Sequence, residues 1–467
     1  MKNEEFATAL RRIKKEEGRI CYRTEYSMKD NPIIYFAEEE ILRLPARMDY
    51  KLVLLKNQED NLLLRDGKVE KMLRATSVSL AINLYLDGRD GFFYTNDLRH
   101  DSVSRFIREA FETTRLLEPD ESRTLADPAR YYKGGGPDLQ NFDASLSDID
   151  VKEKLRLLQE TAAEVEGADH RMLSMQTRYM DRKHQAHYLI SNGFDGEEQS
   201  SYCTLTSLIT VEGEGGQHPM DGWGETRLFF RQMPRSGIAP IALRRTLGKI
   251  GQRPAPAGRY RMIIESPCAG NFLQPILNAM NGQALQQRAS FLWGKLGEQV
   301  LSPLVNIVDD PLQPGTRGAS LFDYDGVATC RRELFTEGRL QTYFIDTPMG
   351  CKLGMQPTTQ GIHRLIMEPT SEASASPLEG KKDTSPAILV TDFNGGNCDP
   401  VTGNFSYGIE GFLIEGGDIV QPVSGMNVTG NMLDVWQRLS HVANDADPWE
   451  TELIPTLTFE DVAFSGC

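Results

Sequence analysis

Pairs of residues that favour tight turns divide this chain into short apolar segments. Their spacing restricts the fold more than any other feature of the sequence. Between residues 50 and 95 the apolar runs are separated by Asp66-Gly67 and Asp87-Gly88, and a similar pair follows at Asn192-Gly193. Such pairs accept the positive φ values of tight hairpin turns. In the second half they recur at Asp325-Gly326, Glu337-Gly338, Gly395-Gly396 and Glu415-Gly416-Gly417. The pattern predicts antiparallel hairpins over 50–95 and 172–211, and a mostly β second half.

Helical spacing of apolar residues occurs in fewer places. After Asp101, for example, Val103, Ile107 and Phe111 recur at intervals of four and indicate a helix that covers one face of a sheet. Further helices are predicted over 4–17, 151–166, 240–250 and 271–280. These elements together predict an α+β fold, with an N-terminal half of sheet and helices followed by a β-rich C-terminal half.

One glycine-rich stretch indicates a boundary inside the first half. Gly134-Gly135-Gly136-Pro137 can continue neither a helix nor a strand, so it reads as a linker. We expect an N-terminal α/β subdomain over 1–133, a central α/β subdomain over 134–238 and a β-rich C-terminal domain over 239–467. Residues 369–386 are rich in serine and lysine, and they predict a mobile loop.

Charge and cysteine content exclude several classes of protein. The formal net charge is −15 and the basic residues form only short pairs such as Arg244-Arg245, so we expect no direct contact with nucleic acid. Charged residues interrupt the first twenty positions and the most apolar stretch, 77–86, is short, which predicts a cytoplasmic protein that does not enter a membrane. Seven cysteines without a Cys-x-x-Cys pair suit reduced thiols.

Few residues suggest chemistry by their spacing alone. His184 and His187 lie three apart in a predicted strand, where period two places them on opposite faces and makes them poor joint metal ligands. Cys398 lies in a glycine-rich loop, although no base for it can be identified. Asp323-Tyr324-Asp325-Gly326 lacks the ligands of a calcium loop and indicates a turn between strands.

A series of ordered segments gives a more specific indication. It includes Phe322-Asp323-Tyr324-Asp325-Gly326, Asn394-Gly395-Gly396-Asn397 and Thr402-Gly403-Asn404-Phe405-Ser406 in the second half, and Leu86-Asp87-Gly88-Arg89-Asp90 in the first. With the segments 301–311, 407–417 and 422–432, this order and spacing resemble the TldD/PmbA family. Its members were once called modulators of DNA gyrase and are now regarded as metallopeptidases.

The resemblance implies a zinc site that this chain does not carry. TldD-type subunits hold zinc with His-Glu-x-x-x-His on the helix early in the second half and with a cysteine near the C-terminus. The corresponding helix here, 267–282, has neither His nor Glu, and the stretch 446–454 has no cysteine. The chain therefore resembles the PmbA (TldE) type. The resemblance predicts no catalytic residue, no metal ligand and no cofactor in this chain.

The resemblance also implies a role beside a zinc enzyme. PmbA-type chains pair with a zinc-bearing TldD-type subunit and form part of a peptide-binding cleft, so we expect a dimer, either with such a subunit or with a second copy, that acts on unfolded peptides. Exposed strand edges in the β-rich half could hold an extended peptide through main-chain hydrogen bonds. The residues predicted to line that site are Gly395, Gly396, Asn397, Cys398, Gly403 and Phe405. The glycines could equally serve tight turns alone.

Two other functions stay open from the sequence. The chain could be an active peptidase with a different nucleophile or metal site, for which Cys398 and the pair His184 and His187 are the candidates. It could also regulate DNA gyrase, as the older family name suggests, without binding DNA directly.

Overall fold

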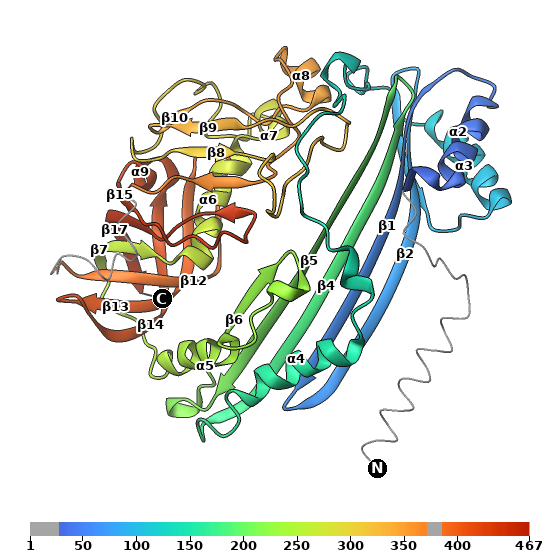
Figure 1. Ribbon diagram of the computed structural model, residues 1–467. Coiled ribbons are helices and arrows are strands. Elements are labelled where there is room, and N and C mark those ends of the chain that lie inside the picture. Colours follow the sequence, from blue (N-terminus) through green and yellow to red (C-terminus); the bar gives the residue numbers. More distant parts are fainter. Residues whose placement is uncertain (1–27, 371–384, 467) are drawn as a thin grey trace.

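A computed structural model describes residues 28–370 and 385–466 of the 467-residue chain. A long N-terminal sheet with helices on one face lies beside a β-rich C-terminal half (Figure 1). The α+β fold predicted from the sequence is confirmed. The predicted helix over 4–17 lies outside the described residues, and so does most of the predicted loop over 369–386.

The N-terminal sheet has six antiparallel strands in the order β3-β2-β1-β4-β5-β6. The hairpin turns fall where predicted: Asp66 and Gly67 join the first two strands with φ values of 49° and 73°, and Phe194 opens the strand after Asn192-Gly193. Positive φ at both central residues matches the right-handed twist of the flanking strands. The strands are β1 (Asp49–Arg65), β2 (Lys68–Leu86), β3 (Arg89–Thr95), β4 (Met172–Ile190), β5 (Phe194–Val211) and β6 (Met220–Arg227).

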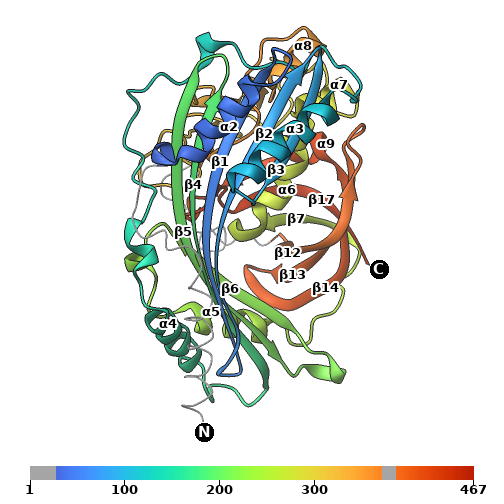
Figure 2. The ribbon, with the colours of Figure 1, turned by 90° about the vertical axis from the view of Figure 1, so that its right-hand side faces the viewer.

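Four helices cover one face of this sheet, as Figures 1 and 2 show. Because side chains alternate along a strand, Leu52 and Leu54 of β1 pack under one pair of helices, while Leu62 and Leu64, on the same face, pack under another helix. The first pair is α2 (Pro32–Leu42) and α3 (His100–Thr114), and the others are α4 (Val151–Ala163) and α5 (Ile238–Gly248). Helices α2 and α3 lie on the side turned away from the C-terminal half, whereas α5 contacts that half through the bond of Arg245 to Glu265.

The opposite face of the sheet meets the C-terminal half at one end. Val53 of β1 packs there with Tyr131 and Phe322, which come from segments outside the sheet. Lys51 is 3% exposed, and its Nζ lies 2.6 Å from Oδ1 of Asp325 and 3.8 Å from the centre of the Tyr324 ring. The motif that resembles the family thus forms a turn that joins the two halves.

Two sheets build the C-terminal half. The larger has the order β14-β13-β12-β7-β17-β15 and curves until β14 also pairs with β17, which closes it (Figure 2). Its strands are β7 (Gly258–Ile264), β12 (Ala387–Cys398), β13 (Asn404–Glu415), β14 (Asp418–Asn431), β15 (Leu439–Val442) and β17 (Leu457–Gly466). The smaller contains β10 (Arg339–Leu340), β9 (Arg332–Thr336), β8 (Ile307–Asp309), β11 (Leu365–Met367) and β16 (Glu452–Leu453).

Helix α6 (Ser266–Ala279) follows β7 directly and packs into the core of this half. The short helices α7 (Gly282–Gln286), α8 (Thr347–Leu353) and α9 (Met432–Trp436) complete it. Phe272 of α6 lies with its ring 5.4 Å from Phe405 and 5.9 Å from Trp436, so the helix is held by aromatic packing.

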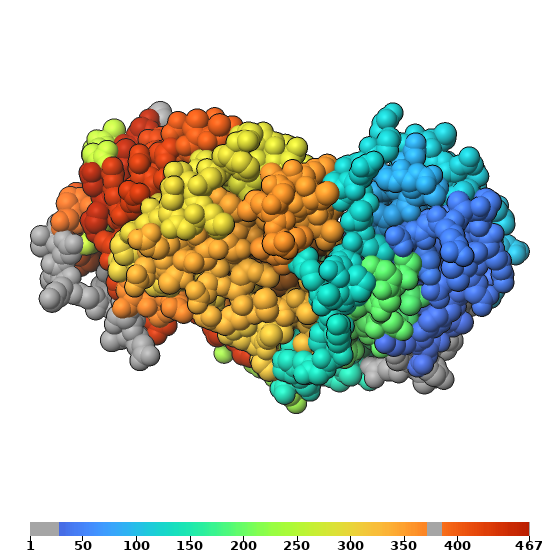
Figure 3. Space-filling model, turned by 90° about the horizontal axis from the view of Figure 1, so that it is seen from above, coloured from blue at the N-terminus to red at the C-terminus, as the bar shows by residue number. Residues whose placement is uncertain are grey.

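Seen from above, the residues nearest the N-terminus, in blue, and those of the C-terminal half, in orange and red, occupy opposite ends of the molecule (Figure 3). The predicted boundary at 133 falls between strands β3 and β4 of a single sheet, and the division into three parts stays a prediction. None of the helices in residues 28–370 and 385–466 is long and apolar enough to cross a membrane.

Candidate functional site

Helix α6 and the stretch 446–454 are the two places where the resemblance puts the zinc ligands of a TldD-type subunit. The structure brings them into contact. The Oγ of Ser266 donates to the carbonyl oxygen of Ile454 at 2.7 Å, and the N–H of Ser266 donates to Oγ1 of Thr456 at 3.1 Å. A Cβ atom on Gly270 would lie 2.8 Å from Oε2 of Glu452. The framework of such a site is therefore assembled from segments about 190 residues apart.

Two carboxylates, Glu265 and Glu452, lie near this junction. Glu265, the residue before α6, accepts from Arg245 of α5 with both oxygens at 2.9 Å. Burial opposes the charge of Arg245, but Glu265 and Asp221 outweigh it and raise the pKa of that guanidinium. Burial, and then the neighbouring Glu450, raise the pKa of Glu452. One carboxylate is thus bound to an arginine, and the other holds its proton to higher pH than an ordinary glutamate.

This set of groups does not fit zinc. A catalytic zinc needs about three protein ligands, drawn from imidazole, thiolate and carboxylate groups. On α6 the buried positions are almost all apolar, and burial followed by Glu265 raises the pKa of the Cys268 thiol to about 12. In the part of the chain that the structure describes, no three His, Cys, Asp or Glu side chains are grouped so that they could hold a metal ion.

The six residues predicted to bind peptide lie together on the β12–β13 hairpin but do not form one surface. Gly395, Gly396 and Asn397 are exposed, and Cys398 is half-buried. Phe405 is buried against α6, and Gly403 is buried beside Phe291. The hairpin tip can meet a ligand, whereas Phe405 and Gly403 belong to the core. That the six residues bind peptide stays a prediction.

Two of these glycines are required by the fold itself. Gly396 has a φ of 103°, and a Cβ there would lie 2.0 Å from the carbonyl oxygen of Ser406 on the paired strand. Gly403 has a φ of 76° and closes the turn between the strands. Gly395 also has a positive φ, 93°, but nothing would meet its Cβ within 4 Å. The turn-forming role thus accounts for Gly396 and Gly403 without any ligand.

The exposed edges expected in the C-terminal half are mostly occupied. Pairing of β14 with β17 closes the larger sheet, and β7 is paired on both sides. Among the described residues, the end of β12 beyond Val390 has β13 as its one strand neighbour. An extended peptide could add to the sheet at that end, next to Asn397 and Cys398.

The residues considered for a different catalytic apparatus are not brought together. Burial and the nearby Asp399 raise the pKa of the Cys398 thiol to about 11, and Sγ contacts the carbonyl oxygen of Asp399 at 3.7 Å. His184 lies on the other sheet with Nδ1 2.9 Å from Oδ1 of Asn57, and buried His187 lies on the opposite face with Nε2 3.0 Å from Asp195. The two histidines face apart, as predicted from period two.

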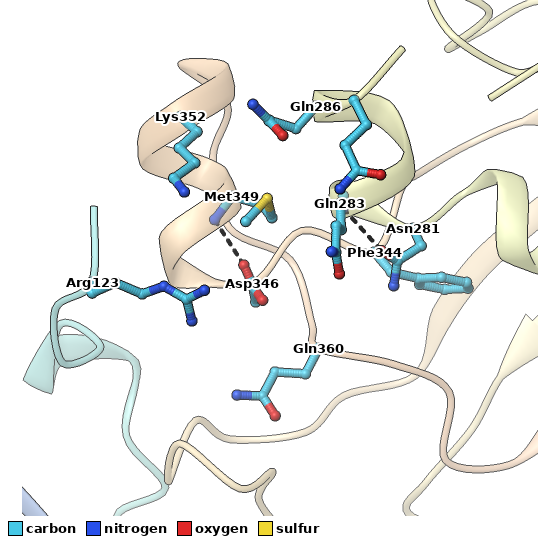
Figure 4. Close-up of a pocket in the computed structure, with 11 residues that line it drawn as sticks. Arg123, Asn281, Gln283, Gln286, Phe344, Asp346, Met349, Lys352 and Gln360 are labelled. Carbon is cyan, nitrogen blue, oxygen red and sulfur yellow. Dashed lines mark hydrogen bonds between the residues drawn. The ribbon is translucent and has the colours of Figure 1, made fainter. Parts of the chain in front are cut away.

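The structure also contains a pocket that sequence reasoning missed. Figure 4 shows it between the two halves, with Arg123 of the first half opposite side chains from α7 and α8. Its volume is about 270 Å³. Its residues come from four separate stretches of the chain, and the one local signal was the repeated glutamine at Gln283, Gln286 and Gln287.

Comparison with known proteins identifies the family of this chain. Three family models match: PmbA/TldA metallopeptidase domain 1 over residues 50–113, the central domain over 144–250 and the C-terminal domain over 257–466. The chain belongs to the TldD/PmbA family. The family resemblance drawn from the ordered segments is thereby confirmed.

Relatives in the TldD/PmbA family cover nearly the whole chain. A metalloprotease PmbA homolog of Haemophilus influenzae is 25% identical over 469 aligned residues, covering 100% of both chains. The metalloprotease PmbA of Escherichia coli O157:H7 is 24% identical, covering 82% of this chain and 84% of its own.

Solved structures of the TldD/PmbA family superpose closely on this chain. A Bacteroides thetaiotaomicron protein, named in its crystal structure as a modulator of DNA gyrase, has 39% identity and a TM-score of 0.91 over 94% of this chain and all of its own. TldE from Thermococcus kodakarensis, at 19% identity, has a TM-score of 0.78 over 93% of this chain and 99% of its own, and this likeness shows the fold alone.

Proposed function

We propose that this chain is the subunit without zinc ligands in a TldD/PmbA-type peptidase system that acts on unfolded peptides in the cytoplasm. The observation that carries the proposal is the junction of α6 with 452–456. Here Ser266, Gly270 and Glu452 stand together, and Glu265 is bound to Arg245. Since these groups lack imidazole and thiolate, metal-dependent hydrolysis has to come from another chain.

The partner in this proposal is a zinc-bearing TldD-type subunit. Our chain would contribute one wall of the peptide cleft, and its hairpin tip at Gly395 to Asn397 is exposed and available for contact. The relatives named as metalloproteases support the class of system, and the missing ligands support the division of labour.

Two measurements on purified protein test the proposal. Metal analysis of the isolated chain should find well below one zinc per chain, and a mixture with a TldD-type subunit should run as a larger species in size-exclusion chromatography with light scattering. One tightly bound zinc in the isolated chain contradicts the absence of a site. A mixture that elutes as two separate species, with peptidase activity unchanged by our chain, contradicts the partner role.

A cysteine peptidase is less well supported. At pH 7 a thiol with a pKa of about 11 is almost fully protonated, and Cys398 has no histidine at hydrogen-bond distance among the described residues. The regulation of DNA gyrase rests on the names of structural relatives alone. A gyrase supercoiling assay with and without the chain decides that alternative.

A further inference from the structure

The pocket of Figure 4 is polar, and none of its lining residues belongs to the α6 junction or to the β12–β13 hairpin tip. Its walls carry an unusual number of side-chain amides, from Asn281, Gln283, Gln286, Gln287 and Gln360. An amide side chain offers a donor and an acceptor together, which is the same pair that a peptide bond presents. Such walls suit a ligand with peptide bonds better than a purely anionic or apolar one.

One cation in the pocket is available to a ligand. The guanidinium of Arg123 has ionic neighbours only at longer range, with Asp120 at 3.5 Å and Asp90 at 3.7 Å, and it makes no hydrogen bond to any described residue. Lys352 differs, because its Nζ donates to Asp120 at 2.7 Å. This bond, with that from Ser122, holds the pKa of Asp120 below its usual range. Arg123 is thus the group that can take a carboxylate by paired hydrogen bonds.

An acceptor stands close to Arg123. Oδ1 of Asp346 accepts from the N–H of Met349 at 2.7 Å, and its second carboxylate oxygen makes no hydrogen bond within the described residues. In Figure 4 the guanidinium of Arg123 points toward Asp346, with Gln283 on the far side. The last residue of a peptide carries a carboxylate and an N–H a few ångströms apart, which matches this pair of groups.

The floor and the size restrict the ligand further. Phe344 and Met349 are 5% and 9% exposed and give the pocket an apolar base for a small side chain. About 270 Å³ is slightly below the range of roughly 300–1,000 Å³ that is typical of small-molecule pockets. The carboxylates of Asp90, Asp120 and Asp346 surround the two cations and repel any anion, so they oppose a dianion such as a phosphate about twice as strongly as a single peptide carboxylate.

We propose that this pocket binds the carboxyl-terminal residues of a short peptide. Arg123 holds the terminal carboxylate, Asp346 accepts from the last N–H, and the amides of Gln283 and Gln286 bond to the peptide group before it. The choice of a peptide rests on the proposed function, whereas the position of the site does not. Because Arg123 comes from the first half and the other groups from the second, a bound peptide end would bridge the two halves.

Isothermal titration of the full chain with trialanine, with trialanine amide as the second probe, tests the site. Trialanine should bind, and amidation should weaken binding about tenfold or more by removing the charge that Arg123 meets. Arg123→Met should weaken trialanine binding by a similar factor, and Gln283→Ala with Gln286→Ala by several-fold. The matched controls are Arg115→Met and Gln356→Ala, which remove the same groups from exposed positions outside the pocket.

Three results would overturn the proposal: no heat or ligand-detected NMR signal with trialanine, equal binding of the amide, or equal weakening by the control variants. Circular dichroism of each variant establishes that it is folded. The absence of trialanine binding would not change the zinc content of the chain or its pairing with a TldD-type subunit. The pocket proposal and the proposed function can therefore fail separately.

Discussion

At residue scale, Gly396 shows how closely the two strands of the β12–β13 hairpin approach. Its φ of 103° and the 2.0 Å separation expected between a Cβ and the Ser406 carbonyl oxygen both oppose any side chain. We predict that Gly396→Ala lowers the free energy of unfolding by about 2–4 kcal/mol, from backbone strain plus displacement of the paired strand.

Gly395→Ala is the matched control, because its positive φ carries strain but its Cβ meets open space. It should cost about 1 kcal/mol. Urea denaturation of both variants, followed by tryptophan fluorescence, measures the difference. Equal losses of stability would show that strand contact at Gly396 is unimportant.

The thiol of Cys398 belongs to the same hairpin and gives a prediction about pH. Burial and then Asp399 raise the pKa of Cys398 to about 11, above the ordinary value of roughly 8.5. At any pH below about 11, Cys398 therefore carries less thiolate than an ordinary cysteine. Alkylation by iodoacetamide should therefore remain slow at pH 8 and rise steeply only as pH approaches 11.

Mass spectrometry of alkylated peptides follows each cysteine separately. Cys330 and Cys351 are exposed and serve as internal references that should react faster at pH 8. Rapid labelling of Cys398 at pH 7 would indicate an activated thiol and would revive the cysteine peptidase alternative.

At element scale, α6 has two positions next to Glu452 at which metal-binding side chains could be introduced. Ser266 and Gly270 are one turn apart and both contact the 452–454 segment. We predict that Ser266→His with Gly270→His gives a two-histidine, one-carboxylate site with Glu452 and binds about one zinc per chain. The close contact at Gly270 is with the flexible end of Glu452, which can move.

The pair Ser266→His with Asn271→His is the control, since residue 271 points away from residue 266 around the helix. Zinc is measured by mass spectrometry of the dialysed protein. Equal zinc in both double variants, or in neither, would contradict the geometry of the junction.

Helix α4 is held on the sheet by a buried ionic group. Nζ of Lys154 lies 2.7 Å from Asp60 and 2.5 Å from Asp181, and all three side chains are buried. Lys154→Met should lower the free energy of unfolding by about 3–5 kcal/mol, because the buried carboxylate of Asp181 loses its cation, whereas Asp60 keeps its bonds from Arg74. Adding Asp181→Asn should recover part of the loss in the same denaturation experiment, whereas Glu153→Met on the same helix should change little.

At the scale of the whole molecule, the turn at 323–326 sets the position of the N-terminal sheet. Lys51 on β1 reaches Asp325 across the boundary, and Gly326 lies so close to Phe194 that a Cβ would fall 2.7 Å from its ring. We predict that Lys51→Met speeds amide hydrogen exchange in 320–329 and at the start of β1 by roughly tenfold or more, since it removes the cation from Asp325 and leaves that carboxylate with its hydrogen bond from Gln360.

Lys71→Met, at an exposed position on β2, is the control for this experiment. Faster exchange spread evenly over the whole chain would indicate general destabilisation. No change in 320–329 would show that the ion pair does not hold the two halves together.

Local chemistry was sufficient to predict the hairpins of the N-terminal sheet and helices α3, α4, α5 and α6, but α2 over Pro32–Leu42 was not predicted. Asp66-Gly67 and Gly193 mark hairpin turns through their positive φ values, and alternation along β4 placed His184 and His187 on opposite faces. The absence of histidine on α6 is likewise a fact of sequence, and it already argued against zinc. These features depend on neighbours a few residues away, so the sequence by itself determined them.

Contacts between distant segments required the tertiary structure. Packing brought α6 against Glu452 and Ile454, paired β14 with β17, and gathered Arg123, Gln283 and Asp346 around one pocket. The same packing moved Phe405 from a predicted peptide site into the core. Such placements arise from the burial of side chains far apart in the chain, which no local spacing encodes, and so only the folded molecule decided them.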